Sequence, residues 1–258
     1  MIHTVLLEKN QVHRHIIIIQ GETMVELKQN AYAQSQSTAI DAGLREYMMK
    51  VYNYMTSGLA ISGLVAWGFS QSPALMGAIY GTGLQWVVML APLGFIFFLG
   101  ARLQKMSLSA AQMTFWAFAA VMGMSMSYIF IVYTGVSIVR VFLITCSTFA
   151  AMSIYGYTTK RDLTKFGSFL IMGLIGIILA SIVNIFMQSS AMHFVISCVG
   201  VLVFVGLTAY DTQKIKSTYY AVAGSSFAGK AAIMGALTLY LDFINLFVML
   251  MQLFGQRR

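Results

Sequence analysis

The chain has 258 residues, of which 59% are hydrophobic and only 9% are charged, and its mean hydropathy is +0.77. Soluble domains usually contain about 25% charged residues, so this composition excludes an ordinary soluble domain and predicts an integral membrane protein. The net charge is +8, but the basic residues lie between apolar segments. That pattern argues against nucleic-acid binding and favours the orientation of helices in a membrane.

The first 45 residues predict a cytoplasmic tail. Residues 1–23 contain one run of four isoleucines, which is too short to span a bilayer. A polar stretch, MVELKQNAYAQSQST, then begins at Met24. We therefore expect Met24 to be the biological start and residues 1–23 to be a gene-model extension.

Seven apolar segments follow, and they predict an all-α integral membrane protein with seven transmembrane helices. Long apolar runs favour helices over the short alternating strands of a barrel. The helical domain is expected at residues 46–255, before a short C-terminal tail at residues 256–258. The apolar segments cover residues 51–69, 81–100, 109–133, 138–157, 166–187, 191–210 and 231–254.

The basic residues predict the orientation of the helices. They concentrate in the N-terminal tail and in the loops after the second, fourth and sixth segments. These regions share one side of a seven-span protein, so the positive-inside rule predicts a cytoplasmic N-terminus and a periplasmic C-terminus. If the seventh segment were re-entrant, the C-terminus would return to the cytoplasm.

Acidic residues are scarce after the first segment, where only Asp162, Asp211 and Asp242 occur. Asp162 lies among basic residues, where an ion pair or a helix cap is expected. We expect the sixth helix to continue past Asp211, which places both other aspartates inside the membrane. An aspartate there can simply bond to neighbouring helices, but such residues more often mark a functional site.

A polar stripe accompanies Asp242, and its spacing places it on one face of a helix. The stripe consists of Thr238, Asp242, Asn245, Met249 and Gln252. We expect the bundle to cover this stripe while lipid contacts the other faces, which makes the seventh helix central. Thr208 lies one turn before Asp211 on the same face and extends the polar surroundings.

Asp211 and Asp242 are predicted to meet, because they lie on antiparallel neighbouring helices. Two carboxylates in a low-dielectric site rarely both ionise, so the pair is expected to share a proton and to titrate near neutral pH. When ionised, the pair offers oxygen ligands to Ca²⁺. It is a weak calcium site at most, because calcium usually takes about six to eight oxygens.

Enzyme and cofactor motifs are missing from the sequence, which has no CxxC, HExxH, P-loop or GxSxG pattern. Tyr210 and Asp211 match the YD motif of intramembrane aspartyl proteases. No glycine precedes Asp242 as the partner GxGD motif requires. The chain is therefore expected to be neither an enzyme nor a cofactor-binding protein.

Four stretches match a known family: SMSYIFIVYT (residues 125–134), YGYTTKRDL (155–163), LTAYDTQKIK (207–216) and LTLYLDFINLF (237–247). Across residues 45–255 the chain resembles the transmembrane Bax inhibitor motif family, in its bacterial branch. The resemblance implies a seven-helix bundle of the bacterial inner membrane, with the C-terminal helix enclosed by the other six. It also implies a pH-sensitive, calcium-permeable leak channel or carrier, in which Asp211 and Asp242 are the pH sensor and ion gate.

The resemblance further implies that Arg102 is a latch that binds the aspartate pair, although this position also suits a positive-inside anchor. Some members have another acid in the second helix, and this chain has none there. The implied partners are the lipid bilayer, H⁺ and Ca²⁺, with Ca²⁺ as the transported ion.

The alternative function is a membrane-embedded regulator in protein quality control or the stress response. Many members of the family are discussed in that role. The polar tail at residues 24–50 would then be the segment that a membrane protease binds, since proteases grip flexible termini.

Overall fold

The computed structural model describes residues 40–258, and the chain divides into two units, residues 1–46 and 47–258. Within residues 1–46 the structure describes only residues 40–46, which are helical. Most of the predicted tail, including Met24 and the expected extension at residues 1–23, lies outside the described residues. The proposed start therefore stays a prediction.

The second unit is helical and begins with a helix of residues 47–70. The elements that follow are α2 (Pro73–Tyr80), α3 (Leu84–Arg102), the 3₁₀ helix η1 (Leu103–Lys105), α4 (Leu108–Met126), α5 (Ile129–Val132), α6 (Gly135–Thr158), α7 (Thr164–Met187), α8 (Ser190–Val222) and α9 (Ala228–Phe254). Residues 40–258 contain no β-strand, only an isolated bridge between Tyr133 and Arg257.

Six helical stretches of the described residues are long and apolar enough to cross a membrane, which confirms the all-α membrane class. They are residues 84–105, 108–132, 135–158, 164–187, 190–222 and 228–254. Each overlaps one of the predicted segments. The 47–70 helix is not among these six, so the count of seven spans stays a prediction.

Polar residues explain where the elements differ from the predicted segments. The short α2 was not predicted; Ser72 caps its start by accepting a hydrogen bond from Leu75 N, and Pro73 occupies its first position. The third segment is interrupted after Met126, where the Ser127 hydroxyl bonds to Met124 O at 2.7 Å. As expected, α8 continues past Asp211, to Val222.

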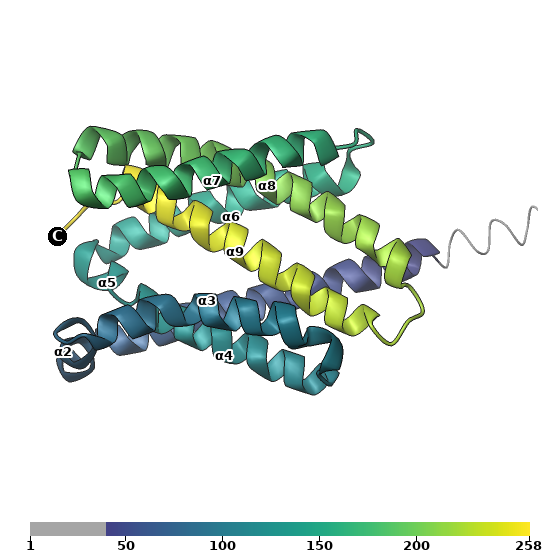
Figure 1. The fold of residues 1–258 in the computed structure, drawn as a ribbon, viewed down its shortest axis with the longest axis horizontal. Helices are drawn as coiled ribbons and strands as arrows, with labels where there is room; N and C mark the ends of the chain where they lie inside the picture. Colours follow the sequence, from purple (N-terminus) through teal and green to yellow (C-terminus); the bar gives the residue numbers. More distant parts are fainter. Residues whose placement is uncertain (1–39) are drawn as a thin grey trace, which may run out of the picture. The chain divides into compact units, whose positions relative to one another are not determined.

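The helix α9 lies between two groups of helices (Figure 1). The 47–70 helix, α3 and α4 lie on one side of it, and α6, α7 and α8 lie on the other. In the most apolar 18-residue window of α9, 67% of the residues are buried, compared with 11% in α3 and α7. The prediction of a central C-terminal helix is confirmed.

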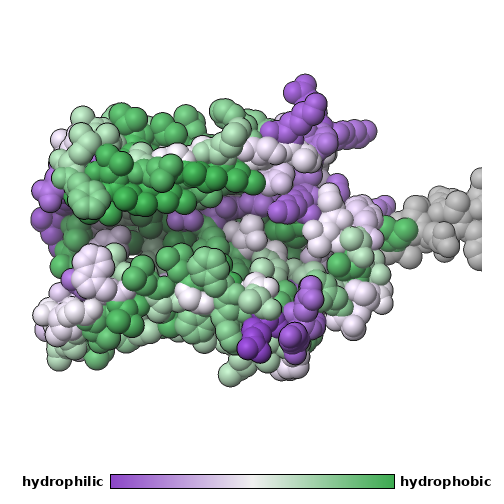
Figure 2. All heavy atoms as spheres, viewed as in Figure 1, coloured by the Kyte–Doolittle hydropathy of each residue, from purple (hydrophilic) through white to green (hydrophobic). Residues whose placement is uncertain are grey.

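The expectation that the apolar faces of α9 form an exposed, lipid-facing surface is wrong. Residues 231–251 include no exposed side chain. Leu239 and Leu246 are fully buried, whereas Thr238 and Asn245 in the polar stripe are only half-buried. Helices from both groups cover α9, so its apolar side chains form the core, and the outer helices contact lipid instead. Figure 2 shows such an apolar surface along α7.

Close contacts at two glycines position α8, the helix that contains Asp211. A Cβ atom at Gly156 of α6 would lie 2.2 Å from Ala209 O, and one at Gly167 of α7 would lie 2.3 Å from the Tyr210 ring. Any larger side chain at these two glycines would displace α8. The two residues immediately before Asp211 are therefore held in place by α6 and α7.

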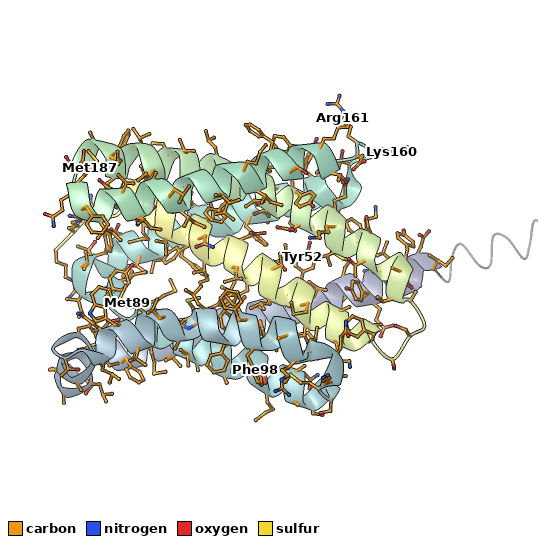
Figure 3. The ribbon with its side chains drawn as sticks, in the orientation of Figure 1. Tyr52, Met89, Phe98, Lys160, Arg161 and Met187 are labelled. Atoms are coloured by element: carbon orange, nitrogen blue, oxygen red, sulfur yellow. The ribbon has the colours of Figure 1, made fainter. Side chains whose placement is uncertain are left out.

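Side chains of α8 and α9 form hydrogen bonds with the turns at one end of the second unit. We call this end, where α3 joins α4, α6 joins α7 and α8 joins α9, the basic end (Figure 1). Lys160 and Arg161 project there, whereas Met187 lies at the opposite end (Figure 3). The Gln213 side chain bonds to Leu163 N and Arg161 O, each at 2.8 Å.

A lysine of α9 makes a similar connection, and Asp162 stabilises the turn before α7. The Lys230 ammonium donates to Gln104 O at 3.0 Å and to Met106 O at 3.2 Å. Asp162 accepts hydrogen bonds from the backbone N–H and the hydroxyl of Thr164, the first residue of α7. These bonds hold the pKa of the Asp162 carboxyl below its ordinary value.

Candidate functional site

The structure brings Asp211 of α8 and Asp242 of α9 into hydrogen-bond contact through their side chains. Only 9% of Asp211 and 5% of Asp242 are exposed. Asp242 follows the first residue of α9, Ala228, by fourteen positions. It therefore lies about 21 Å along the helix at about 1.5 Å per residue. The pair is enclosed by protein, far from either end of α9.

A hydrogen bond between two carboxyl groups requires a proton, because an ionised carboxylate is only an acceptor. The contact therefore requires at least one of the two groups to be a carboxylic acid, and the sharing of a single proton by the pair stays a prediction. Burial favours this arrangement, because two ionised carboxylates at this distance would repel each other in a low dielectric. The pair can change its charge and its contact together when it gains or loses that proton.

One oxygen of the pair is left open. Asp242 Oδ2 is buried and has no hydrogen-bond partner among residues 40–258. A buried acceptor without a partner is unfavourable by about 1–3 kcal/mol, and a water molecule or a cation would relieve that penalty. Within the same residues, no group of three or more Asp, Glu, His or Cys side chains is placed to hold a metal ion. The weak calcium site at these aspartates stays a prediction.

The predicted supporting residues do not bond to the aspartates. The Thr208 hydroxyl donates to Phe204 O at 2.8 Å, and the Thr238 hydroxyl donates to Met234 O at 3.1 Å. Each hydroxyl thus bonds to its own helix, one turn back. Asn245 is half-buried on α9, one turn after Asp242.

The structure does not place Arg102 on the aspartate pair. Its side chain is exposed at the end of α3, and within residues 40–258 no hydrogen bond or ion pair joins it to Asp211 or Asp242. The cation that interacts electrostatically with Asp211 is Lys214, one turn later on α8. The latch role of Arg102 stays a prediction, and it requires the side chain to move.

A chain of three hydroxyl groups next to Asp211, two of them buried, was not anticipated from the sequence. The Thr212 hydroxyl donates to Thr208 O at 2.7 Å, so its own oxygen is left to accept. Ser153 lies 3.0 Å from that oxygen, and the Tyr52 hydroxyl lies 2.6 Å from Ser153. The donors therefore point from Tyr52 (labelled in Figure 3) to Ser153 to Thr212, and they join the 47–70 helix, α6 and α8.

A second hydroxyl contact fixes α9 two residues before Asp242. The Tyr240 hydroxyl lies 2.6 Å from the Ser62 hydroxyl, which also lies 2.7 Å from Ala119 O. The Tyr240 ring is fully buried against Phe115 and Phe118. These contacts join α9 to the 47–70 helix and α4, so both aspartate-bearing helices are held by buried hydrogen bonds.

The polar stripe of α9 ends at a cavity of about 200 Å³ at the opposite end of the unit. Tyr128, His193, Gln252 and Arg257 are among the residues that line it. The C-terminal residues close this side: Arg258 N bonds to Val132 O at 3.0 Å. The stripe thus extends from the aspartate pair to a polar cavity.

Comparison with known proteins places this chain in a family. The family described as "Inhibitor of apoptosis-promoting Bax1" matches residues 44–258. The chain is 46% identical over 235 residues to "Uncharacterized protein RP147" of Rickettsia prowazekii, covering 91% of this chain and 100% of that protein. It is 47% identical over 220 residues to "Inner membrane protein YbhL" of Escherichia coli K12, covering 84% and 94% of the two chains.

Proposed function

The chain belongs to the Bax inhibitor-1 family, and we propose that it is a pH-sensitive, calcium-permeable leak channel or carrier gated by the Asp211–Asp242 pair. It is a multi-pass membrane protein, and its similarity to an inner membrane protein places it in the inner membrane. The observation that carries the proposal is the contact between two buried carboxyl groups, one of which belongs to the central helix.

In the proposed mechanism, the shared proton holds α8 and α9 together at the pair. Loss of that proton leaves two adjacent negative charges, which must separate or gain a positive partner. Arg102 is the proposed partner, and its binding closes the cytoplasmic mouth. Two features support this: the carboxyl groups bond to each other, and Arg102 is exposed and apart from them. These features fit the protonated, unlatched state.

Calcium is proposed to pass along the polar stripe of α9. The ionised pair attracts a divalent cation but supplies few ligands, so binding is weak enough for release. Asp242 Oδ2, which has no partner among residues 40–258, is the oxygen that an entering cation would meet. The polar cavity that contains Gln252 would be the far opening of this route.

The test is calcium entry into liposomes that contain the purified protein and a calcium dye. For the wild type, we expect entry to change between about pH 6 and 8, where a coupled carboxyl pair can titrate. Asp211→Asn and Asp242→Asn should each abolish that dependence. Asp162→Asn is the matched control, because it replaces an exposed acid outside the site and should preserve the wild-type profile.

Two results would count against the proposal. One is a pH profile that remains unchanged in both site variants. The other is entry no faster than into empty liposomes, measured with protein shown to be folded. The regulator function predicted from residues 24–50 would then be the preferred hypothesis, and a pull-down with and without residues 24–45 would test it.

A further inference from the structure

The second unit contains an apolar cavity of about 230 Å³ that the proposed ion path does not use. Four parts of the fold line it: the 47–70 helix, the junction of α4 and α5, α6 and α9. Among the lining residues are Gly63, Ala66, Ile129, Phe142, Phe243 and Phe247. An apolar cavity of about 150 Å³ is enough to bind benzene in another protein, so this one can accept a hydrocarbon ligand.

The cavity has no free polar group to hold water. Ser62 is the one hydroxyl-bearing residue in its lining. That hydroxyl already lies within hydrogen-bond distance of Tyr240, Gly58 O and Ala119 O. Because a cavity water needs two to four polar partners, water is excluded as the occupant.

The cavity is continuous with the surface that faces lipid. Val139 and Phe142 of α6 line it, yet 59% and 42% of these side chains are exposed. They belong to a helix that is long and apolar enough to span the membrane. The exposed apolar side chains of such a helix contact the acyl chains of the bilayer, so the cavity opens into hydrocarbon.

We propose that this cavity binds the acyl chain of a bilayer phospholipid. The chain would pack against Phe243 and Phe247, which follow Asp242 on α9. Phe243 is itself held by edge-on contacts with Phe142 and Phe149, with ring centroids 5.7 and 5.5 Å apart. A bound chain would thus contact the central helix one residue from its aspartate. This proposal stands independently of the calcium leak.

Glycine substitutions allow a clean test. A Cβ atom at Gly63 would meet no atom within 4 Å, so Gly63→Leu should fill the cavity without displacing a helix. Gly68 lies on the same helix, also has open space around it and does not line the cavity. Gly68→Leu is therefore the matched control. Gly63→Ala adds a single methyl group and serves if the leucine variant folds poorly.

The full chain would be placed in nanodiscs of phosphatidylethanolamine that has a diazirine near the end of one acyl chain. After irradiation, mass spectrometry would locate the lipid adducts on the peptides of α6, α7 and α9. In the wild type, adducts should be enriched at the cavity residues. Gly63→Leu should lower them by about tenfold, because it excludes roughly two methylene groups from the cavity.

Gly63→Ala should produce a smaller decrease, and Gly68→Leu none. Labelling of the exposed face of α7 should be equal in all the proteins. Cavity labelling no higher than that of α7, or unaffected by both Gly63 variants, would overturn the proposal. So would a dimer, seen by native mass spectrometry, that Gly63→Leu dissociates, because the cavity would then be a contact between two copies.

Discussion

Replacing Ser153 with alanine should destabilise the protein by more than the loss of either one of its two hydroxyl hydrogen bonds would. Ser153 is only 4% exposed, and its hydroxyl accepts from Tyr52 and donates to Thr212. Thr212 keeps its own bond to the backbone in the variant, but the Tyr52 donor loses its acceptor. A buried donor without a partner costs about 1–3 kcal/mol. Because Tyr52 is half-buried, we expect the lower half of that range.

The companion variants isolate this effect. Tyr52→Phe removes the donor itself and should cost about 1 kcal/mol or less, the typical net worth of a hydrogen bond. In the double variant no orphaned donor remains, so its cost should be smaller than the sum of the single costs. Ser147→Ala is the control on the same helix, because Ser147 is exposed and bonds only to Leu143 O.

Thermal unfolding in one fixed detergent would rank the four variants against the wild type. The expected order of destabilisation is Ser153→Ala, then Tyr52→Phe, then Ser147→Ala with almost no effect. If Ser153→Ala unfolded at the same temperature as Ser147→Ala, the hydroxyl chain would not hold these helices. Strict additivity in the double variant would refute the argument from the orphaned donor.

Three further predictions concern other parts of the fold. Gly156→Val should greatly reduce the yield of folded protein, because its Cβ would lie 2.2 Å from a backbone oxygen of α8. Gly176→Val should leave the yield unchanged, because a Cβ there would meet no atom within 4 Å. Size-exclusion chromatography would measure both yields. In liposomes, Arg102→Gln should keep calcium entry high at alkaline pH. If entry in this variant closed at alkaline pH as in the wild type, Arg102 would not be part of the gate. The pKa of Asp162 is depressed in the folded protein, so this carboxyl group stabilises the fold at a pH above its unfolded-state pKa of about 3.9. That contribution is lost as the pH falls below this pKa. Asp162→Asn should therefore remove this part of the acid dependence in unfolding measurements from about pH 3 to 6.

The fold class and the aspartates were predictable because they leave local signals in the sequence. A span appears as a long apolar run, and an acid inside such a run is conspicuous, as at Asp242. The burial of α9 was only partly predictable. Its polar stripe indicated a central helix. The number of neighbouring helices that cover its other faces depends on tertiary packing, and the local sequence around Leu239 and Leu246 does not indicate that these residues are fully buried.

The hydroxyl contacts were not predictable for a different reason. Serine and threonine in helices commonly bond to the carbonyl one turn back, as Ser147 does. Nothing in the sequence distinguishes such a residue from Ser62 or Ser153, which bond across helices. Likewise, the sequence predicts that both Arg102 and Lys214 are cations at the membrane interface. Only the structure separates the one that interacts with Asp211 from the one that does not.

Infrared spectroscopy of the protein in lipid, titrated with pH, tests most directly whether Asp211 and Asp242 share a proton near neutral pH. The wild type should show the carbonyl band of a protonated carboxyl group, and the band should disappear between about pH 6 and 8. The same band should be absent from the double variant Asp211→Asn and Asp242→Asn, while Asp162→Asn should retain it. A wild-type spectrum without the band, or with a band that does not change across this range, would contradict the shared proton and the gate built on it.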